Sequence, residues 1–354
     1  MADQRDQGKL VEIQFLRGLA AATVALAHIA WAFADNIGGG FGFQLDTSQA
    51  SQAAVMLFFV ISGFIIVISS RGLFGRADGP KVFWTRRVVR VLPPYWIATA
   101  LLLAVLTMLW SRQVDVTELA MSIALIPYFS DPENLRAMPF LWVGWTLFYE
   151  MVFYALFGLL IARSRRAAIG GAVVGLLALS VTGLLVAPEN AIFWTATRPV
   201  LLLFIVGIAL AIMRERGWLA PVWLRWAGLL ASLVVFLLVP KPTNETAMGF
   251  DYLLWCGVPA ILFAFSIIAG PIRLPTPQAL NRAGDMSYAL YLLHVPIAWA
   301  WLWFYPKLPF FKPGPWDFFF TASLVAFGLS WLFYKHVEEP MTRWLNARSG
   351  AART

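Results

Sequence analysis

Apolar stretches of membrane-spanning length recur along the whole sequence and decide its fold class. A bilayer core of about 30 Å takes roughly 20 apolar residues in helical conformation, because every backbone hydrogen bond must be made inside the segment. With 60% hydrophobic and 13% charged residues among 354, the chain is too apolar for an ordinary soluble domain. We predict an all-α, polytopic integral membrane protein with about ten transmembrane helices, approximately at residues 11–34, 53–70, 93–110, 142–163, 168–187, 199–214, 222–240, 251–270, 285–305 and 316–336.

Basic residues fall mainly on one side of this topology. When loops are assigned alternately to the two faces of the membrane, 20 of the 27 Lys and Arg residues share a side with the N-terminus and six lie on the other. Positively charged loops stay in the cytoplasm, so we predict cytoplasmic termini in a bacterial cytoplasmic (inner) membrane. The asymmetry also explains the net charge of +8, which therefore requires no nucleic-acid partner.

No repeat, heptad pattern or low-complexity tract divides the sequence. We expect one transmembrane domain over residues 1–340 and a short cytoplasmic tail over 341–354. The first apolar stretch is too long for a cleaved signal peptide and carries Arg17, so we expect it to remain in the mature protein. The single cysteine, Cys256, lies in an apolar run. It allows no intramolecular disulfide or multi-thiolate site, and no metal is expected.

Ionisable residues inside the predicted spans are the strongest functional candidates, because a charge in the bilayer core costs at least ~2.5 kcal/mol. Arg17 and His28 lie eleven residues apart in the run LRGLAAATVALAH. Eleven helical residues make three turns plus about 20° and rise about 16 Å. Both side chains therefore share one face of the first helix. The arginine lies nearer its cytoplasmic end and the imidazole nearer its outer end.

Further polar residues lie in the fourth and ninth spans. Glu150, in TLFYEMVFY, is either the structural partner of a buried cation or a titrating group, and we favour a functional role. Tyr288, Tyr291 and His294, in GDMSYALYLLHVPI, follow at i, i+3 and i+6, which places neighbouring members on adjoining helix faces. The two tyrosines either pack or donate hydrogen bonds to a substrate carbonyl.

The densest cationic stretch, KVFWTRRVVRVLPPYW, contains Arg86, Arg87 and Arg90. We expect Pro93-Pro94 to end this segment. The arginines either anchor the chain among lipid headgroups or form a phosphate clamp at the cytoplasmic mouth, because guanidinium groups bind phosphate oxygens bidentately. The residues alone leave both interpretations open. Upstream, Ser62-Gly63 interrupts a bulky apolar run, where we expect close helix packing.

Six segments resemble, in the same order, the motifs of the acyltransferase family 3 membrane proteins. LRGLAAATVALAH resembles the family's R-x10-H, FFVISGFII its FFVLSGFLI, and FWTRRVVRVLPPYW its F-x-RR-x-x-R-I-x-P-x-Y. WTLFYEMVFY resembles W-S-L-x-x-E-x-x-F-Y, GDMSYALYLLH resembles G-x-x-S-Y-x-x-Y-L-x-H, and VEEP resembles the closing E-x-P. The matches cover nearly the whole chain, including the ten-helix topology of the family.

The resemblance implies a membrane O-acyltransferase. Members take an acyl group, usually acetyl, from cytoplasmic acyl-coenzyme A and pass it to a hydroxyl, typically of a sugar in a surface glycan. This implies acetyl-coenzyme A as the donor and a carbohydrate or lipid-linked glycan as the acceptor. By position, His28 corresponds to the catalytic histidine, Arg17 to the arginine needed with it, Glu150 to the intramembrane carboxylate, and Arg86, Arg87 and Arg90 to the basic motif, which we assign to donor binding.

Two departures from the family pattern stand out. Met151 occupies a position where members often have a second acidic residue, which argues against a carboxylate pair at this motif. Many members also continue into a periplasmic hydrolase-like domain after the last span. Here only a few residues follow, so we expect the stand-alone form.

The sequence allows two routes for the reaction. His28 acts either as general base on the acceptor hydroxyl or as a nucleophile that first takes the acyl group, with Glu150 or His294 orienting the imidazole. We expect acceptor contacts from the outer loops 35–52 and 111–141. The competing class is a multi-span transporter or flippase without acyl transfer, because intramembrane Arg, His and Glu also build proton or substrate pathways. We favour the enzyme, since the two halves of the sequence show no repeated pattern.

Overall fold

A computed structural model describes residues 10–36, 47–186, 188–244, 248–270, 278–308 and 314–349. Most of the predicted outer loop 35–52 and the last residues of the predicted tail lie outside the described residues. Within them the regular structure is helical, with no strand beyond an isolated bridge between Asp131 and Arg136.

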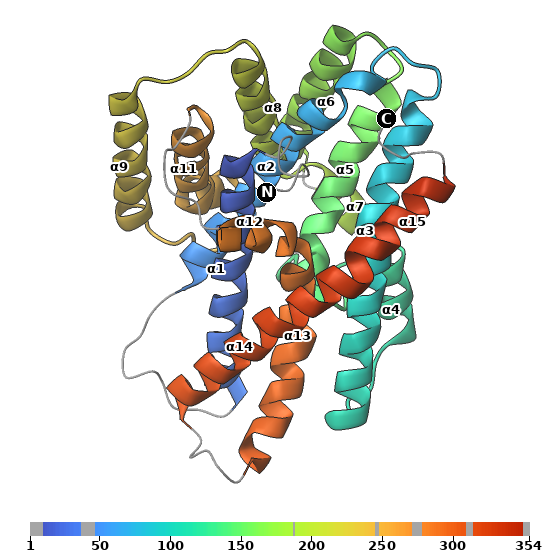
Figure 1. Cartoon of the computed structure of the whole chain (residues 1–354), viewed down its shortest axis with the longest axis vertical. Helices are drawn as coiled ribbons and strands as arrows, with labels where there is room; N and C mark the ends of the chain where they lie inside the picture. Colours follow the sequence, from blue (N-terminus) through green and yellow to red (C-terminus); the bar gives the residue numbers. More distant parts are fainter. Residues whose placement is uncertain are drawn as a thin grey trace.

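The helices form one bundle, shown in Figure 1. In chain order they are α1 (Val11–Asn36), α2 (Ser48–Ser69), α3 (Gly79–Ala104), α4 (Val116–Ile123), α5 (Trp145–Leu160), α6 (Arg165–Leu185), α7 (Ala191–Ala196), α8 (Leu202–Glu215), α9 (Val222–Leu238), α10 (Phe250–Tyr252), α11 (Val258–Ile268), α12 (Gln278–Asp285), α13 (Ser287–Phe304), α14 (Pro315–Phe333) and α15 (Glu339–Arg348).

Eight helical segments in the described part of the chain are long and apolar enough to cross a membrane. They correspond to eight of the ten predicted spans. The other two predicted spans, 222–240 and 285–305, form α9 and α13, which have 17 and 18 residues. The all-α, polytopic membrane class predicted from the sequence is confirmed.

The third span differs from the prediction, because Pro93-Pro94 does not end a segment. Both prolines lie inside α3, which begins at Gly79 and continues through a π-helical turn to Leu109. A proline lacks an N–H donor and presses on the carbonyl four residues earlier, but neighbouring groups inside a membrane protein can satisfy the disturbed backbone. Nearby, and separately from the Val89 and Arg90 carbonyls that lose a donor, the Tyr288 hydroxyl donates to the Val91 carbonyl oxygen over 2.9 Å and ties α13 to α3. The arginine cluster therefore stands on the same helix as the span that follows it.

Glycines bring α2 and α8 into direct backbone contact. A Cβ atom at Gly63 would lie 2.2 Å from the Phe204 carbonyl oxygen, and one at Gly207 would lie 2.0 Å from the Val60 carbonyl oxygen. Any side chain at either position would force the helices apart. The predicted packing role of Gly63 is confirmed.

A short helix, α12, rests against the first half of α1 in the same way. A Cβ atom at Gly284 would meet the Gln14 carbonyl oxygen at 2.3 Å, and one at Gly18 would lie 3.1 Å from the Ala283 side chain. The chain then turns at Met286 into α13, whose contacts with α1 are extensive. This arrangement carries the GDMSYALYLLH segment onto the helix that holds Arg17 and His28.

The last two helices form one continuous helical rod. α14 runs through a π-helical turn, Tyr334–Glu338, into α15, and the rod crosses the bundle obliquely in Figure 1. Its 34 residues correspond to about 51 Å, which exceeds the bilayer core of about 30 Å. Residues 341–348, predicted to belong to the tail, are therefore the helical end of this rod, and α15 packs on α3.

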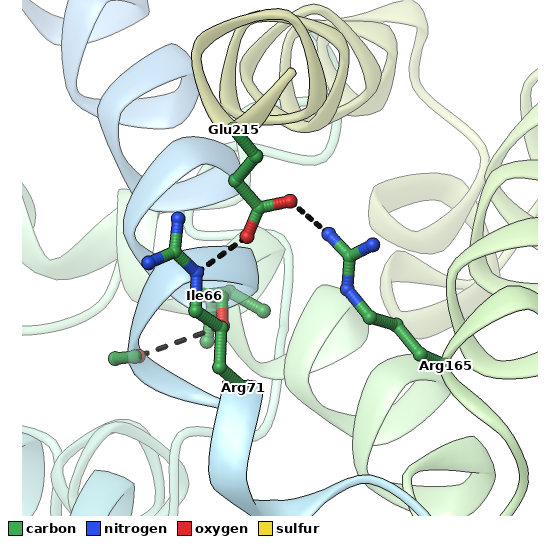
Figure 2. A network of polar contacts seen from close by, with 5 residues as sticks. Ile66, Arg71, Arg165 and Glu215 are labelled. Carbon is green, nitrogen blue, oxygen red and sulfur yellow. Dashed lines mark hydrogen bonds and ion pairs between the residues drawn. The ribbon is translucent and has the colours of Figure 1, made fainter. Parts of the chain in front are cut away.

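Ion pairs join three helix ends on the face predicted to be cytoplasmic. Glu215, at the end of α8, accepts hydrogen bonds from Arg71, over 2.5 Å, and from Arg165 (Figure 2). Both arginine side chains are largely exposed, and exposed pairs contribute about 0–1 kcal/mol. The network therefore positions the ends of α2, α6 and α8 more than it stabilises the fold.

Candidate active site

All the predicted site residues except Arg86 line two cavities that follow one another along α1. The inner cavity, of about 90 Å³, is lined by residues that include Arg17, Ser62, Arg87, Arg90, Glu150, Tyr288 and Tyr291. The outer cavity, of about 460 Å³, is lined by residues that include His28, Trp31, Asp35, Asp131, Arg136, Trp142, His294 and Trp299. Because α1 is a single helix, Arg17 and His28 lie about 16 Å apart along its axis.

Arg17 is held in the inner cavity by a chain of hydrogen bonds. Its Nη1 donates to Gln14 Oε1 over 3.2 Å, and Gln14 Nε2 donates to Asp285 Oδ1 over 2.5 Å. Gln14 lies one turn before Arg17 on α1, and Asp285 ends α12. The close contact of the two helices at Gly284 thus fixes the direction of the guanidinium.

The basic motif contributes two of its three arginines to the same cavity. Arg87 is buried, its Nη2 donates to Ser69 Oγ over 2.5 Å, and its guanidinium lies 5.6 Å from the centre of the Phe83 ring. Arg90 lines the cavity one turn further along α3. Arg86 does not line it and is half-buried one turn before Arg90.

Glu150 lies in the inner cavity and not beside His28. Ser62 Oγ donates to Glu150 Oε1 over 2.5 Å, which joins α2 to α5. The carboxylate faces the arginine-lined space together with Tyr154 and Tyr288. Of the two partners predicted for His28, His294 is the one that contacts it.

His28 and His294 form a directly hydrogen-bonded pair at the floor of the outer cavity. His28 Nδ1 lies 2.8 Å from His294 Nε2, and His294 Nδ1 lies 2.9 Å from the Leu290 carbonyl oxygen. Both rings are buried. The Trp142 ring packs edge-on against His28, with ring centres 4.4 Å apart, and the Trp31 ring lies 5.0 Å away.

The Leu290 carbonyl dictates the protonation pattern of this pair. A carbonyl oxygen only accepts hydrogen bonds, so His294 Nδ1 carries the hydrogen and neutral His294 offers a lone pair on Nε2. His28 Nδ1–H must then donate to that lone pair. When both rings are neutral, this leaves His28 Nε2 without a hydrogen, 3.5 Å from Ser51 Oγ. A base or a nucleophile requires such a nitrogen.

A thin layer of protein separates the two cavities. The Tyr291 hydroxyl donates to the Val143 carbonyl oxygen over 2.7 Å and lies 3.1 Å from Thr146 Oγ1. Val143 belongs to a short turn, Trp142–Gly144, whose Trp142 faces the outer cavity. We call Tyr291, Thr146 and this turn the partition.

Both tyrosines predicted as hydrogen-bond donors to a substrate carbonyl have protein partners. Tyr291 donates to Val143 and Tyr288 to Val91, in each case to a main-chain carbonyl. In this arrangement their hydroxyl hydrogens are engaged. The packing alternative for these residues therefore describes the observed contacts better.

Glu338 belongs to the inner site, although sequence reasoning gave it no role. It lies in the π-helical turn of the last rod, is buried, and is close enough to Arg17 and Arg90 to interact with both electrostatically. Single π-helical turns are frequent at functional sites. The VEEP motif, which resembles the closing E-x-P of the family, was the available signal for this residue.

Comparisons with known proteins agree with the motifs. The family model described as "Acyltransferase domain", of acyltransferase family 3, matches residues 10–335. The chain is 35% identical over 252 residues to "Exopolysaccharide production protein ExoZ" of Rhizobium meliloti (strain 1021), covering 68% of this chain and 75% of that protein. It is 26% identical over 314 residues to "Acyltransferase MdmB" of Streptomyces mycarofaciens, covering 81% of this chain and 78% of that protein. No solved structure matches significantly.

The family match spans most of the chain and contains both cavities. It includes the helix that carries Arg17 and His28, the basic motif on α3, Glu150 on α5 and His294 on α13. The chain therefore belongs to acyltransferase family 3.

Proposed function

We propose that this protein transfers an acetyl group from acetyl-coenzyme A, bound on the cytoplasmic side, to a hydroxyl of a glycan on the outer side of a bacterial inner membrane. One observation carries the proposal: an arginine-lined cavity and a cavity with an unprotonated histidine nitrogen lie in series along α1. Family membership favours acyl transfer over the transporter alternative. The name of the relative ExoZ refers to exopolysaccharide production, which supports a glycan acceptor.

The donor fits the inner cavity by its two unlike ends. Coenzyme A has a polyanionic nucleotide head and a long, thin, nearly neutral arm, and the inner cavity combines arginines with aromatic and aliphatic side chains. We assign the arm to the cavity and the phosphates to its mouth, where Arg87 and Arg90 would bind them bidentately. Glu150 and Glu338 keep part of the arginine charge balanced in the absence of the donor.

The transfer step uses the lone pair on His28 Nε2. As general base, it takes the proton of the acceptor hydroxyl while that oxygen attacks the thioester carbon. The new C–O bond forms, the C–S bond breaks, and the proton passes from Nε2 to the coenzyme A thiolate. His294 stabilises the transient imidazolium by accepting the hydrogen bond from Nδ1–H.

The alternative route uses the same nitrogen as a nucleophile. His28 Nε2 then attacks the thioester carbon, the C–S bond breaks, and the coenzyme A thiolate takes a proton from water. The acceptor hydroxyl next attacks the acetyl carbon, the C–N bond to His28 breaks, and the hydroxyl proton passes to water. Rapid quenching after mixing with radiolabelled acetyl-coenzyme A alone separates the two routes. Label on His28 establishes the two-step route, and its absence favours direct transfer.

The test of the proposed function is acetyl transfer by purified protein in lipid nanodiscs. We expect coenzyme A release that depends on a glycan acceptor, and we expect His28→Ala to abolish it while coenzyme A binding stays within about twofold, because the donor clamp and Nε2 lie about 16 Å apart. His336→Ala is the matched control, since this exposed histidine lies in the π-helical turn of the last rod and lines neither cavity.

Two results would contradict the proposal. One is the absence of acetyl transfer by the wild-type protein with acetyl-coenzyme A. The other is a folded His28→Ala protein that acetylates at the wild-type rate, because the reaction would then proceed without the nitrogen assigned to it.

A further inference from the structure

Three indole rings from three different elements line the outer cavity. Trp31 comes from α1, Trp142 from the turn before α5, and Trp299 from α13. Two contacts hold Trp299 in place. The Arg112 guanidinium lies 5.1 Å from its ring centre, and Trp110 Nε1 donates to its carbonyl oxygen over 3.2 Å. The cavity is therefore walled by aromatic surfaces whose positions are set by packing.

The rim of the cavity is polar and is built by a short hairpin. Asp131 and Arg136 are joined as an antiparallel pair, with Arg136 N donating to the Asp131 carbonyl oxygen over 2.9 Å. Side chains paired in this way point to the same side, and both line the outer cavity. Asn134 Nδ2 donates to Asp131 Oδ2 over 2.8 Å, and this side-chain hydrogen bond lowers the pKa of the Asp131 carboxyl below its ordinary value. Asp35, at the end of α1, lies at the same rim.

The dimensions suit a small ring. His28 and Asp35 are seven residues apart on α1, so the floor lies about 10 Å below this part of the rim. The volume of about 460 Å³ is within the range of small-molecule sites, roughly 300–1,000 Å³. Aromatic walls with a few polar groups match a ligand that is apolar on its ring face and rich in hydroxyls at its edge.

We propose that the outer cavity binds one pyranose residue of the acceptor, with its C–H face against the indole walls, its edge hydroxyls donating to Asp131 and Asp35, and one hydroxyl at His28 Nε2. This inference rests on the proposed function and adds the acceptor site to it. Carboxylates accept hydrogen bonds from hydroxyls, and a ring held from rim to floor brings a hydroxyl to the unprotonated nitrogen. The hairpin and Trp31 therefore select the acceptor and do not bind the donor.

The experiment uses the methyl α- and β-pyranosides of glucose, galactose and mannose as acceptors for the purified protein in nanodiscs. We expect transfer of radiolabelled acetyl to at least one pyranoside. With that acceptor, Trp31→Ala and Asp131→Asn should each raise the acceptor KM by about tenfold, equivalent to about 1.4 kcal/mol. The coenzyme A Kd, measured separately, should stay unchanged. Trp316→Ala and Asp317→Asn are matched controls, because both residues are exposed at the start of α14 outside the cavity.

The outcomes separate the acceptor site from the proposed function. If the wild-type protein acetylates a glycan polymer but none of the six pyranosides, a single-ring site is overturned while the proposed function stands. If it acetylates a pyranoside and both cavity variants keep the wild-type acceptor KM, the assignment of the ring to this cavity is wrong. If both variants lose coenzyme A binding as well, the cavity acts on the donor and the inference also fails.

Discussion

One main-chain carbonyl determines which ring nitrogen of His28 carries the hydrogen. The Leu290 oxygen fixes the hydrogen on His294 Nδ1, and His294 in turn fixes the hydrogen on His28 Nδ1. In a Ser-His-Asp site an aspartate has the corresponding place, and it both orients the imidazole and stabilises the imidazolium. In the proposed mechanism a second, buried imidazole takes this place, where an added carboxylate would carry a desolvation cost.

Replacing His294 should therefore alter rate and pH dependence more than stability. We expect His294→Leu to lower the transfer rate by roughly 10²-fold or more, since loss of the orienting partner costs about 10⁴-fold in a Ser-His-Asp site. His294→Gln should recover much of the rate, because its amide oxygen can accept from His28 Nδ1–H. The measurement is the pH–rate profile of acetyl transfer for both variants.

A merely structural histidine gives a different pattern. Both variants would then lose thermal stability alike and would keep the wild-type pH–rate profile per folded molecule. Equal rates for the leucine and glutamine variants would therefore count against the orienting role.

Sequence spacing predicted the vertical order of the site residues but not their lateral neighbours. The distance from Arg17 to His28 follows from helix geometry alone, and the structure contains that helix. The sequence left Glu150 and His294 as alternative partners for His28. Only the packing of α5 and α13 around α1 decides which one does, and such lateral placement depends on contacts far apart in the sequence.

At the scale of helices, the basic motif separates into positions with different surroundings. Arg90 lines the inner cavity, whereas Arg86 lies one turn earlier and outside its lining. We expect Arg90→Ala to raise the coenzyme A Kd by about tenfold or more, because a hydrogen bond to a charged group contributes roughly 1.5–3 kcal/mol. Arg86→Ala should have a smaller effect. Direct titration with coenzyme A measures both.

The lipid-anchor interpretation makes the opposite forecast for this pair. It treats the two arginines as equivalent cations near the headgroups. An unchanged coenzyme A Kd in the Arg90 variant, together with altered membrane insertion in both variants, would support it.

The contact between α2 and α8 sets the position of Ser62 and hence of its hydrogen bond to Glu150. We expect Gly207→Ala to lower the free energy of unfolding by roughly 1–3 kcal/mol, because overpacking of this size moves the backbone. Gly170→Ala is the control, since a Cβ atom there meets nothing within 4 Å and alanine favours a helix by about 1 kcal/mol. Thermal unfolding in detergent measures the change, and equal stability of the two variants would show that the helices separate without cost.

Helix ends were harder to predict than helix cores. Pro93-Pro94 was expected to end a segment by the rule for isolated helices, but both prolines lie inside α3, as membrane-protein helices tolerate. Likewise, the π-helical turn that buries Glu338 has no local sequence pattern, because the i→i+5 bonds depend on how the rod packs on α3. Both features depend on contacts between residues that are far apart in the sequence.

For the whole molecule, membrane orientation follows from charge and can be tested directly. We expect a cysteine at Asn36 to react with a membrane-impermeant maleimide added to intact cells, and one at Ala77 to react only after permeabilisation. Both positions are exposed, and the native Cys256 is buried, so the wild-type protein is the background control. The reverse labelling pattern would overturn the assignment of the inner and outer cavities.

A protein with cavities reaching toward opposite sides of a membrane must also preserve the membrane's electrical insulation. At 100 mV, each charge that leaks across dissipates about 2.3 kcal/mol. The partition meets this requirement with hydroxyls that are bonded inside the protein, Tyr291 to Val143 and Thr146 beside it. In the proposed function, the thin, neutral arm of the donor displaces these groups as it passes, whereas a hydrated ion would find no partners to replace its water. If the proposed function is right, the narrow inner cavity would let an acyl group cross while the cell's electrochemical gradient is retained.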